Sequence, residues 1–187
     1  MRPADLYLDL TSTVAACLLS LVLVRALLHK LSRHAELTGT IRNYRLVSHE
    51  LVPLTAALVV VCEACAALGL MLPQTRAPAA LLACALLLIY AAAMGINLLR
   101  GRTSIDCGCG GAPQGISCLH VLRNLLLALC AVPAMAAGSI HGPTGFELSA
   151  VTAGCVLALW FIFLAFDQLL GNQTHAGATQ YSSVWRP

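Results

Sequence analysis

The run PAALLACALLLIYAAAMGINLL at residues 78–99 decides the fold, because it contains no charged residue over its whole length. An α-helix rises about 1.5 Å per residue, so a run of this length crosses the roughly 30 Å hydrocarbon core of a bilayer. Four further apolar runs have comparable length, and they occupy residues 10–28, 52–72, 119–137 and 146–170. The sequence therefore predicts an all-α, polytopic membrane helical bundle with about five transmembrane helices.

The composition supports a protein that resides in a lipid bilayer. Of the 187 residues, 59% are hydrophobic and 10% are charged, and the mean hydropathy is +0.82. An average soluble domain carries roughly a quarter charged residues. The formal net charge of +3 is too small to indicate a nucleic-acid partner. We expect one membrane-embedded bundle over residues 1–170 and a short polar tail over residues 171–187.

The stretch DCGCGG at residues 106–111 is the strongest candidate for a functional site, because it lies in a polar interval between two predicted spans. A thiol on a water-accessible loop can do redox or metal chemistry, whereas a thiol in an apolar helix behaves as a small hydrophobic group. Of the nine cysteines, Cys107, Cys109 and Cys118 lie outside the predicted spans. The other six are interpreted as packing residues: Cys17, Cys62, Cys65, Cys84, Cys130 and Cys155.

The spacing of Cys107 and Cys109 favours a labile disulfide over a structural one. A bridge between residues i and i+2 closes a small ring, and Gly108 lets the backbone bend at low cost. Strained, exposed disulfides are typically the labile or catalytic ones. Nearby arginines and the start of the next helix favour the thiolate form. We therefore assign redox chemistry to Cys107 and Cys109, with Cys118 as a third, shuttling thiol.

Two other interpretations of this segment stay open. Four zinc-type ligands follow one another in a C-x-C-x8-C-x-H pattern: Cys107, Cys109, Cys118 and His120. This spacing departs from the two-residue gap that is usual within a structural zinc pair, so our site assignment includes no metal. Alternatively, the segment is a glycine-rich turn whose cysteines have no chemical role.

Glu63 places a carboxylate near the middle of the second predicted span. It follows Val52 by about 11 residues, which corresponds to roughly 16 Å along a helix and to a depth close to the bilayer midplane. An ionisable side chain at that depth faces the bundle interior and is a functional candidate by default. The alternative is a buried hydrogen-bond anchor between helices. Cys62 and Cys65 form a C-x-x-C around Glu63, which we attribute to chance, and a hidden resolving thiol at one of the two positions is the alternative.

Residues 30–51 connect the first two spans and mix charged with apolar side chains. Apolar residues recur every three to four positions at Leu37, Ile41 and Tyr44, which indicates a short helix on the membrane surface. Such a helix would cover a pocket between the spans, and a solvated loop is the alternative. Because spans alternate in direction, we expect this connector and the cysteine loop on the same side of the membrane.

The cysteine loop at residues 106–111 is followed by the pair Arg123-Asn124 near the start of an apolar span. Upstream, the same chain carries HKL at residues 29–31, IRNYRLV at residues 41–47, Glu63 and Gly69. In this order the stretches resemble the methylamine-utilisation protein MauE family and the wider DoxX-like membrane proteins, from about the first span to the fourth. One departure is Gly110, where the family often has a bulky residue.

The resemblance implies a role in disulfide formation and maturation of the periplasmic methylamine dehydrogenase small subunit, together with a thioredoxin-like partner, MauD. It also implies a bacterial inner-membrane protein whose cysteine loop faces the periplasm. The positive-inside rule favours the opposite orientation, because lysines and arginines are more numerous on the side of the cysteine loop. The layout of four helices with cysteines before the fourth is also similar to vitamin K epoxide reductase, which implies a quinone as electron acceptor.

Three hypotheses about function follow from these observations. The first is a thiol-disulfide oxidoreductase of the membrane, with its site at Cys107, Cys109, Cys118 and Glu63. The second is a non-catalytic membrane scaffold that docks and stabilises the thioredoxin-like partner. The third is a zinc-stabilised membrane protein.

Overall fold

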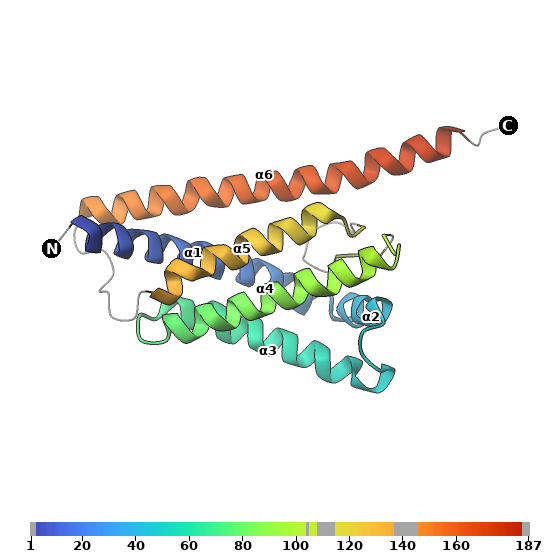
Figure 1. Cartoon of the computed structure of the whole chain (residues 1–187), viewed down its shortest axis with the longest axis horizontal. Coiled ribbons are helices and arrows are strands. Elements are labelled where there is room, and N and C mark those ends of the chain that lie inside the picture. The colour runs from blue at the N-terminus through green and yellow to red at the C-terminus, as the bar shows by residue number, and fades with distance from the viewer. Residues whose placement is uncertain (1–2, 104, 108–114, 137–145, 185–187) are drawn as a thin grey trace.

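The computed structural model describes the backbone of residues 3–103, 105–107, 115–136 and 146–184, and the side chains of residues 6–103, 105–107, 115–135 and 149–172. Within these ranges the chain forms helices and one short 3-10 turn (Figure 1). The elements in chain order are α1 (Pro3–Ser32), α2 (His34–Tyr44), η1 (His49–Leu51), α3 (Val52–Met71), α4 (Arg76–Leu99), α5 (Cys118–Ala136) and α6 (Phe146–Val184). No strand occurs in the described residues, which confirms the predicted all-α class.

Five helices are long and apolar enough to cross a membrane, and they contain or closely match the five predicted spans. The chain is therefore a multi-pass membrane protein. The crossing segments are Leu6–Ser32, His49–Met71, Arg76–Leu99, Cys118–Met135 and Ser149–Asn172. Prolines mark both ends of α3: Pro53 lies in its first turn, where no amide hydrogen is needed, and Pro73 follows its last turn. Ala137, the last residue of the fourth predicted span, lies outside the described residues.

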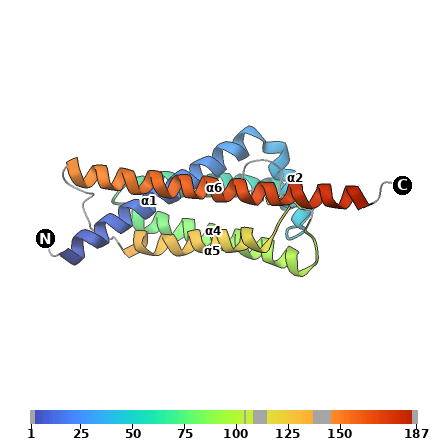
Figure 2. The same cartoon turned by 90° about the horizontal axis from the view of Figure 1, so that it is seen from above.

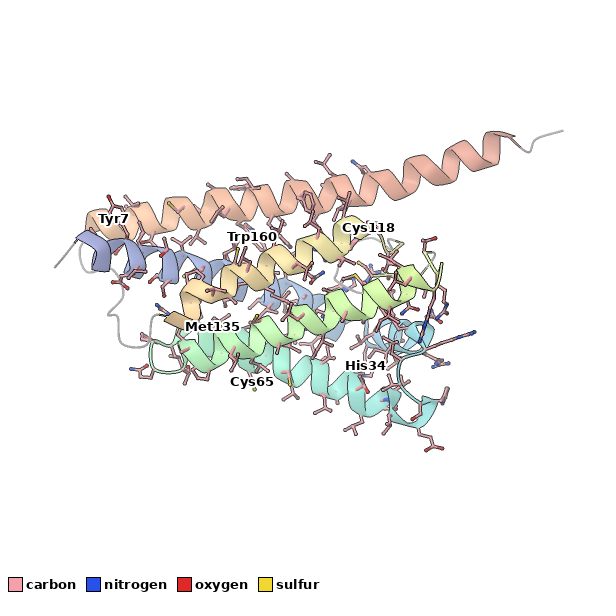
Figure 3. The ribbon with its side chains drawn as sticks, in the orientation of Figure 1. Tyr7, His34, Cys65, Cys118, Met135 and Trp160 are labelled. Atoms are coloured by element: carbon pink, nitrogen blue, oxygen red, sulfur yellow. The ribbon has the colours of Figure 1, made fainter. Side chains whose placement is uncertain are left out.

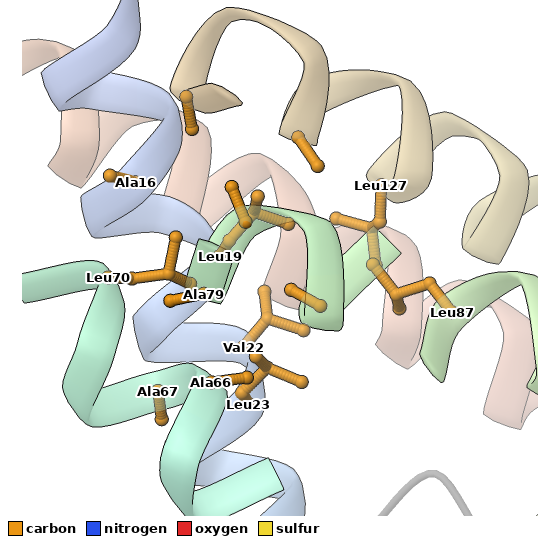
Figure 4. Close-up of a cluster of buried hydrophobic side chains, with 14 of the residues drawn as sticks. Ala16, Leu19, Val22, Leu23, Ala66, Ala67, Leu70, Ala79, Leu87 and Leu127 are labelled. Atoms are coloured by element: carbon orange, nitrogen blue, oxygen red, sulfur yellow. The ribbon is translucent and has the colours of Figure 1, made fainter. Parts of the chain in front are cut away.

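The core lies where α1, α3, α4 and α5 meet, and alanines make up much of it (Figure 4). Ala16, Ala66 and Ala80 are fully buried, and leucines such as Leu19 and Leu70 fill the spaces between them. Small side chains let membrane helices approach closely, and that contact replaces the hydrophobic effect that lipid cannot supply.

Gly69 marks a close approach between α3 and α4. A Cβ atom placed on Gly69 would lie 2.8 Å from the Cβ of Ala79, well inside the normal contact distance. The hydroxyl of Thr75 caps the same turn by donating a hydrogen bond of 2.9 Å to the carbonyl of Gly69. The two helices are thus packed tightly at the end of the bundle that is opposite to α2 (Figure 1).

Helix α6 runs along α1 at the edge of the bundle (Figures 1 and 2). Most of its described side chains are exposed on the outer surface of the bundle, as expected for a helix that faces lipid. The helical backbone continues to Val184, through most of the polar segment that we predicted as a tail. The proposed division at residue 170 stays a prediction.

The connector after α1 forms the short helix α2, which confirms the predicted helix over the solvated loop. Its position on the membrane surface stays a prediction. Leu37 and Tyr44 are its buried side chains, and both belong to the predicted apolar stripe. Arg45 ends the helix in a left-handed conformation, with φ at 50°. Helix α2 lies at the same end of the bundle as the segment between α4 and α5 (Figure 1), as the alternation of spans predicted.

Candidate functional site

The cysteine loop is pinned at its base. Asp106 and Gly115 form an isolated antiparallel bridge, and the amide of Ile116 donates a hydrogen bond of 3.0 Å to the carbonyl of Ile105. Glycine is required at position 115, because a Cβ there would lie 2.7 Å from the carbonyl oxygen of Thr103. Residues 108–114, which connect the two sides of the base, lie outside the described residues. They include Cys109 and three glycines of the predicted site, Gly108, Gly110 and Gly111.

Tyr44 of α2 packs against this base. Its ring forms a buried cluster with Met94, Ile105 and Ile116. Its hydroxyl donates a long hydrogen bond of 3.4 Å to the carbonyl of Cys107. Cys107 is half-buried beside the cluster. The surface helix therefore holds the first cysteine of the loop against the membrane-embedded bundle.

Glu63 is fully buried and is bound by two side chains from other helices. The Lys30 ammonium donates a hydrogen bond of 2.5 Å to Glu63 Oε1, and the Tyr90 hydroxyl donates one of 2.7 Å to the same oxygen. Lys30 is also buried, and its nitrogen lies 5.3 Å from the centroid of the Tyr90 ring. The charge of the carboxylate is thus balanced inside the bundle, as a buried ion requires.

A cavity of about 230 Å³ joins the Glu63 cluster to the cysteine loop. Lys30, Glu63 and Tyr90 form part of its wall, and Cys107 and Tyr44 form another part. Its remaining walls are mainly apolar, and all six α-helices contribute to them. Residues of α2 are among them, which agrees with the predicted pocket beneath the connector helix. Glu63 Oε2 is buried and has no hydrogen-bond partner among the described residues. The structure therefore brings together two of the predicted site residues, Cys107 and Glu63.

The third predicted thiol lies elsewhere. Cys118 is exposed at the first turn of α5, at the same end of the bundle as His34 of α2 (Figure 3), and it does not line the cavity. Cys65 of the C-x-x-C points outward from α3 (Figure 3) and is exposed, which agrees with a chance occurrence of that motif.

The proposed zinc ligands are only partly described, because Cys109 lies outside the described residues. His120 is buried, and its Nδ1 lies 2.8 Å from the Ser117 hydroxyl. In the part of the chain that the structure covers, no three His, Cys, Asp or Glu side chains are arranged to hold a metal ion.

A second charged network connects three helices. Arg25 of α1 donates a hydrogen bond of 2.8 Å to Asp167 Oδ2 of α6, and Arg123 of α5 donates one of 2.5 Å to Oδ1. The Arg25 guanidinium also lies 5.8 Å from the ring centroid of Phe163. Both arginines and Phe163 line the cavity.

Sequence reasoning did not assign Lys30, Tyr90 or Asp167 to the site. Lys30 stands at the end of its helix and was counted among the cations that set topology. A carboxylate at mid-membrane depth needs a cation, and that requirement was the available signal for Lys30. The sequence offered no comparable signal for Tyr90, because it stands in an otherwise apolar run.

The fold and the site together define a multi-pass helical membrane protein with a cysteine loop beside a buried, partly charged cavity. The chain belongs to the MauE family, because the family model described as methylamine utilisation protein MauE matches residues 8–137.

Curated relatives agree with this assignment, and each is named methylamine utilization protein MauE. The protein of Paracoccus denitrificans is 43% identical over 144 residues, which cover 72% of this chain and 77% of that relative. The protein of Methylorubrum extorquens is 36% identical over 176 residues, covering 91% of this chain and 93% of the relative. The protein of Methylophilus methylotrophus is 36% identical, with 84% of each chain covered.

No solved structure matches the chain. The expected similarity in layout to vitamin K epoxide reductase therefore has no support, and it carries no further argument.

Proposed function

We propose that this protein is a membrane thiol-disulfide redox protein that acts in methylamine utilisation. In this role it assists maturation of the methylamine dehydrogenase small subunit, together with a thioredoxin-like partner of the MauD type. One observation carries the proposal: Cys107 lies at the pinned base of the loop and on the wall of a cavity that also contains the buried Lys30–Glu63 pair. Family membership supports the pathway, and the cysteine loop supports the chemistry.

The proposed chemistry is a thiol-disulfide exchange. A thiolate of the thioredoxin-like partner attacks the disulfide between Cys107 and Cys109, and a mixed disulfide forms as one sulfur leaves as a thiolate. The second partner thiol then resolves the mixed disulfide. The partner gains one disulfide and loses two electrons and two protons, and the loop gains two thiols. Cys118, exposed at the start of α5, is assigned the role of a further exchanging thiol.

Serine substitutions test this proposal. In cells that express the full chain and its target, Cys107→Ser and Cys109→Ser should each abolish maturation of the small subunit, measured by its disulfides and its activity. One of the two variants should also trap the partner as a mixed disulfide. The matched control is Cys65→Ser, because Cys65 is exposed on the outer face of α3 and does not line the cavity. Full maturation with both single loop variants would exclude the redox role.

The proposed orientation places the cysteine loop in the periplasm, because stable disulfides form there. Two cations on that side have partners within the bundle: Lys30 binds Glu63, and Arg102 donates a hydrogen bond of 3.1 Å to Asn97. Because these two cations have partners within the protein, their number on that side reflects the structure as well as the orientation. The positive-inside rule, which favours the opposite orientation, is therefore weaker evidence here. Alkaline phosphatase inserted in the cysteine loop should be active, and the same enzyme inserted after Pro73 should be inactive. The reverse result would overturn the orientation.

A scaffold role is the second candidate, and one observation favours it. Helix α2 presents exposed charged side chains, among them Arg42 and Arg45, next to the loop, so a partner could bind there without chemistry. The two candidates differ in a double Cys107→Ser/Cys109→Ser variant. A scaffold would keep the cellular level of the thioredoxin-like partner normal in that variant and would still support maturation, whereas a redox protein would not support it.

A further inference from the structure

We infer that the cavity beside Glu63 binds a lipid-soluble quinone, with a ring oxygen held by Lys30 and Glu63. The inference rests on the proposed function for its purpose, because the thiols of the loop need an acceptor for their electrons. The location of the proposed quinone site rests on the structure alone. Quinone binding and the redox function can fail separately, and the experiment below distinguishes the two failures.

The shape of the cavity suits a ring with an apolar tail. Its volume of about 230 Å³ lies just below the roughly 300–1,000 Å³ range of small-molecule sites, which suits a single ring whose tail extends out of the cavity. Buried side chains such as Leu23, Leu87 and Leu127 form its apolar walls. Ile89 and Leu46 also line it, and both are exposed on the outside of the bundle. Ile89 lies on the membrane-spanning helix α4, so on that side the cavity reaches the surface that faces lipid, which selects for a ligand that is dissolved in lipid.

The polar atoms of the wall fit an oxygen that changes between acceptor and donor. Lys30 Nζ carries three hydrogens, of which one is donated to Glu63 Oε1, so hydrogens remain for a carbonyl oxygen. Glu63 Oε2 is buried without a partner among the described residues, so it can accept a hydrogen bond from a hydroxyl. A buried acceptor without a partner is unfavourable, and a bound hydroxyl would relieve that cost. A quinone presents the carbonyl, and its reduced form presents the hydroxyl.

The cations around the cavity favour a ligand that gains electron density. Arg25, Lys30 and Arg123 line it as cations, and Glu63 is the carboxylate in its wall. The two arginines share Asp167 of α6 as their common anion. A fatty acid is the alternative lipid-soluble occupant, and Glu63 would repel its carboxylate only if that group were placed at the Glu63 end of the cavity.

The electron balance closes with this class of acceptor. A quinone takes up two electrons and two protons to become a hydroquinone, while two thiols release the same number and become a disulfide. Cys107 forms part of the same cavity wall as Lys30 and Glu63, so the described thiol and the proposed head-group site face one space. The Lys30 ammonium holds a proton at that site, and the Tyr90 hydroxyl keeps the Glu63 carboxylate in place.

Tryptophan fluorescence provides a direct binding assay. Trp160 stacks on Phe163, with their ring centroids 5.5 Å apart, and Phe163 lines the cavity. The chain contains two tryptophans, so Trp185→Phe leaves Trp160 as the only reporter. The full chain with this change, reconstituted in lipid nanodiscs, is titrated with a ubiquinone that carries a single isoprene unit. We expect saturable quenching of the Trp160 emission.

Two matched sets of variants locate the binding. Ala93→Phe fills the cavity, whereas Ala92→Phe adds the same ring to the adjacent, exposed position on α4. Ala93→Phe should weaken binding by at least about tenfold, and Ala92→Phe should leave it unchanged. A Lys30→Met/Glu63→Gln double variant, which removes both charges together, should also weaken binding by about tenfold, as expected for the loss of a charged hydrogen bond.

Three outcomes would overturn the inference. Quenching that does not saturate would show that the quinone only dissolves in the bilayer. Equal binding by Ala93→Phe and Ala92→Phe would place the quinone outside the cavity. Saturable quenching by a brominated oleate, lost in Ala93→Phe while the ubiquinone has no effect, would assign the cavity to a fatty acid. The titration is repeated in Cys107→Ser: binding there, together with full maturation by the cysteine variants, would reject the redox role and keep the quinone site.

Discussion

Lys30 Nζ lies 2.5 Å from Glu63 Oε1, and this contact connects the end of α1 with the middle of α3. Both side chains are almost completely buried, at 6% and 0% exposure. A buried ion pair adds little over a well-packed apolar pair, but the loss of one partner leaves an uncompensated charge in the bundle. A substitution that removes the charge at position 30 is therefore tolerated best when the charge at position 63 is removed as well.

This constraint predicts a strong coupling between Lys30 and Glu63. Lys30→Met alone should lower the free energy of unfolding by about 3–5 kcal/mol, because it leaves the carboxylate unpaired. Adding Glu63→Leu should restore most of that loss. A double-mutant cycle measures the coupling: the unchanged protein, the two single variants and the double variant are each unfolded in mixed micelles. Additive effects of the two substitutions would contradict a direct ion pair.

The contact between Tyr44 and Cys107 predicts that packing, rather than the hydrogen bond, keeps this cysteine in place. The hydrogen bond is long, at 3.4 Å, whereas the ring is buried against Met94 and the base of the loop. Tyr44→Phe should leave the rate of Cys107 alkylation by a maleimide nearly unchanged, within about threefold. Tyr44→Ala should raise that rate by about tenfold or more, since it removes the ring from the buried cluster against which Cys107 packs. Equal rates in the two variants would refute this assignment.

The close approach of α3 and α4 predicts a reciprocal rescue. Gly69→Ala should destabilise the protein by about 1–3 kcal/mol, because the new methyl group would lie 2.8 Å from the methyl group of Ala79. Exchanging the two residues, with Ala79→Gly added, should restore most of the stability, since the pair then has its original volume. Thermal unfolding of the single and double variants tests this. A double variant that is less stable than Gly69→Ala would show that the contact is not the cause.

The positions of the cysteines predict that six of them are dispensable. Cys17, Cys62, Cys65, Cys84, Cys130 and Cys155 lie on membrane-spanning helices, and none lines the cavity. Replacing all six by alanine or valine should keep the cellular level of the protein within about twofold and retain maturation of the proposed target. Restoring only Cys62 and Cys65 should bring no further gain. A gain from that pair would assign a role to the C-x-x-C.

The helices could be predicted from sequence because each one carries its own signal. A membrane span needs only a long apolar run, and the run at residues 78–99 satisfies that condition without reference to any other part of the chain. The stripe of Leu37 and Tyr44 predicted the surface helix α2 for the same reason, since amphipathic spacing is a local property.

The partners within the site could not be predicted, because they depend on how helices are placed against each other. Glu63 was found from its depth alone, but its partner at position 30 is 33 residues away, and the contact requires the packing of α1 on α3. Arg25 lies near the end of the first predicted span, and its position in the sequence identifies no partner. The structure gives it Asp167, which is 142 residues away.

The network around Asp167 has a consequence for biosynthesis. The ribosome delivers Arg25 and Arg123 to the membrane before Asp167, which belongs to the last helix. Arg25 and Arg123 lie toward the ends of their spans, so inserting them without a carboxylate partner costs less than the about 2.5–3.5 kcal/mol of an arginine at the centre of a span. The nascent bundle therefore carries two guanidinium groups without the α6 carboxylate until α6 itself is translated. The arrival of α6 supplies the one carboxylate that both arginines share, so the contact between α1 and α5 at this point is completed by a helix that follows both.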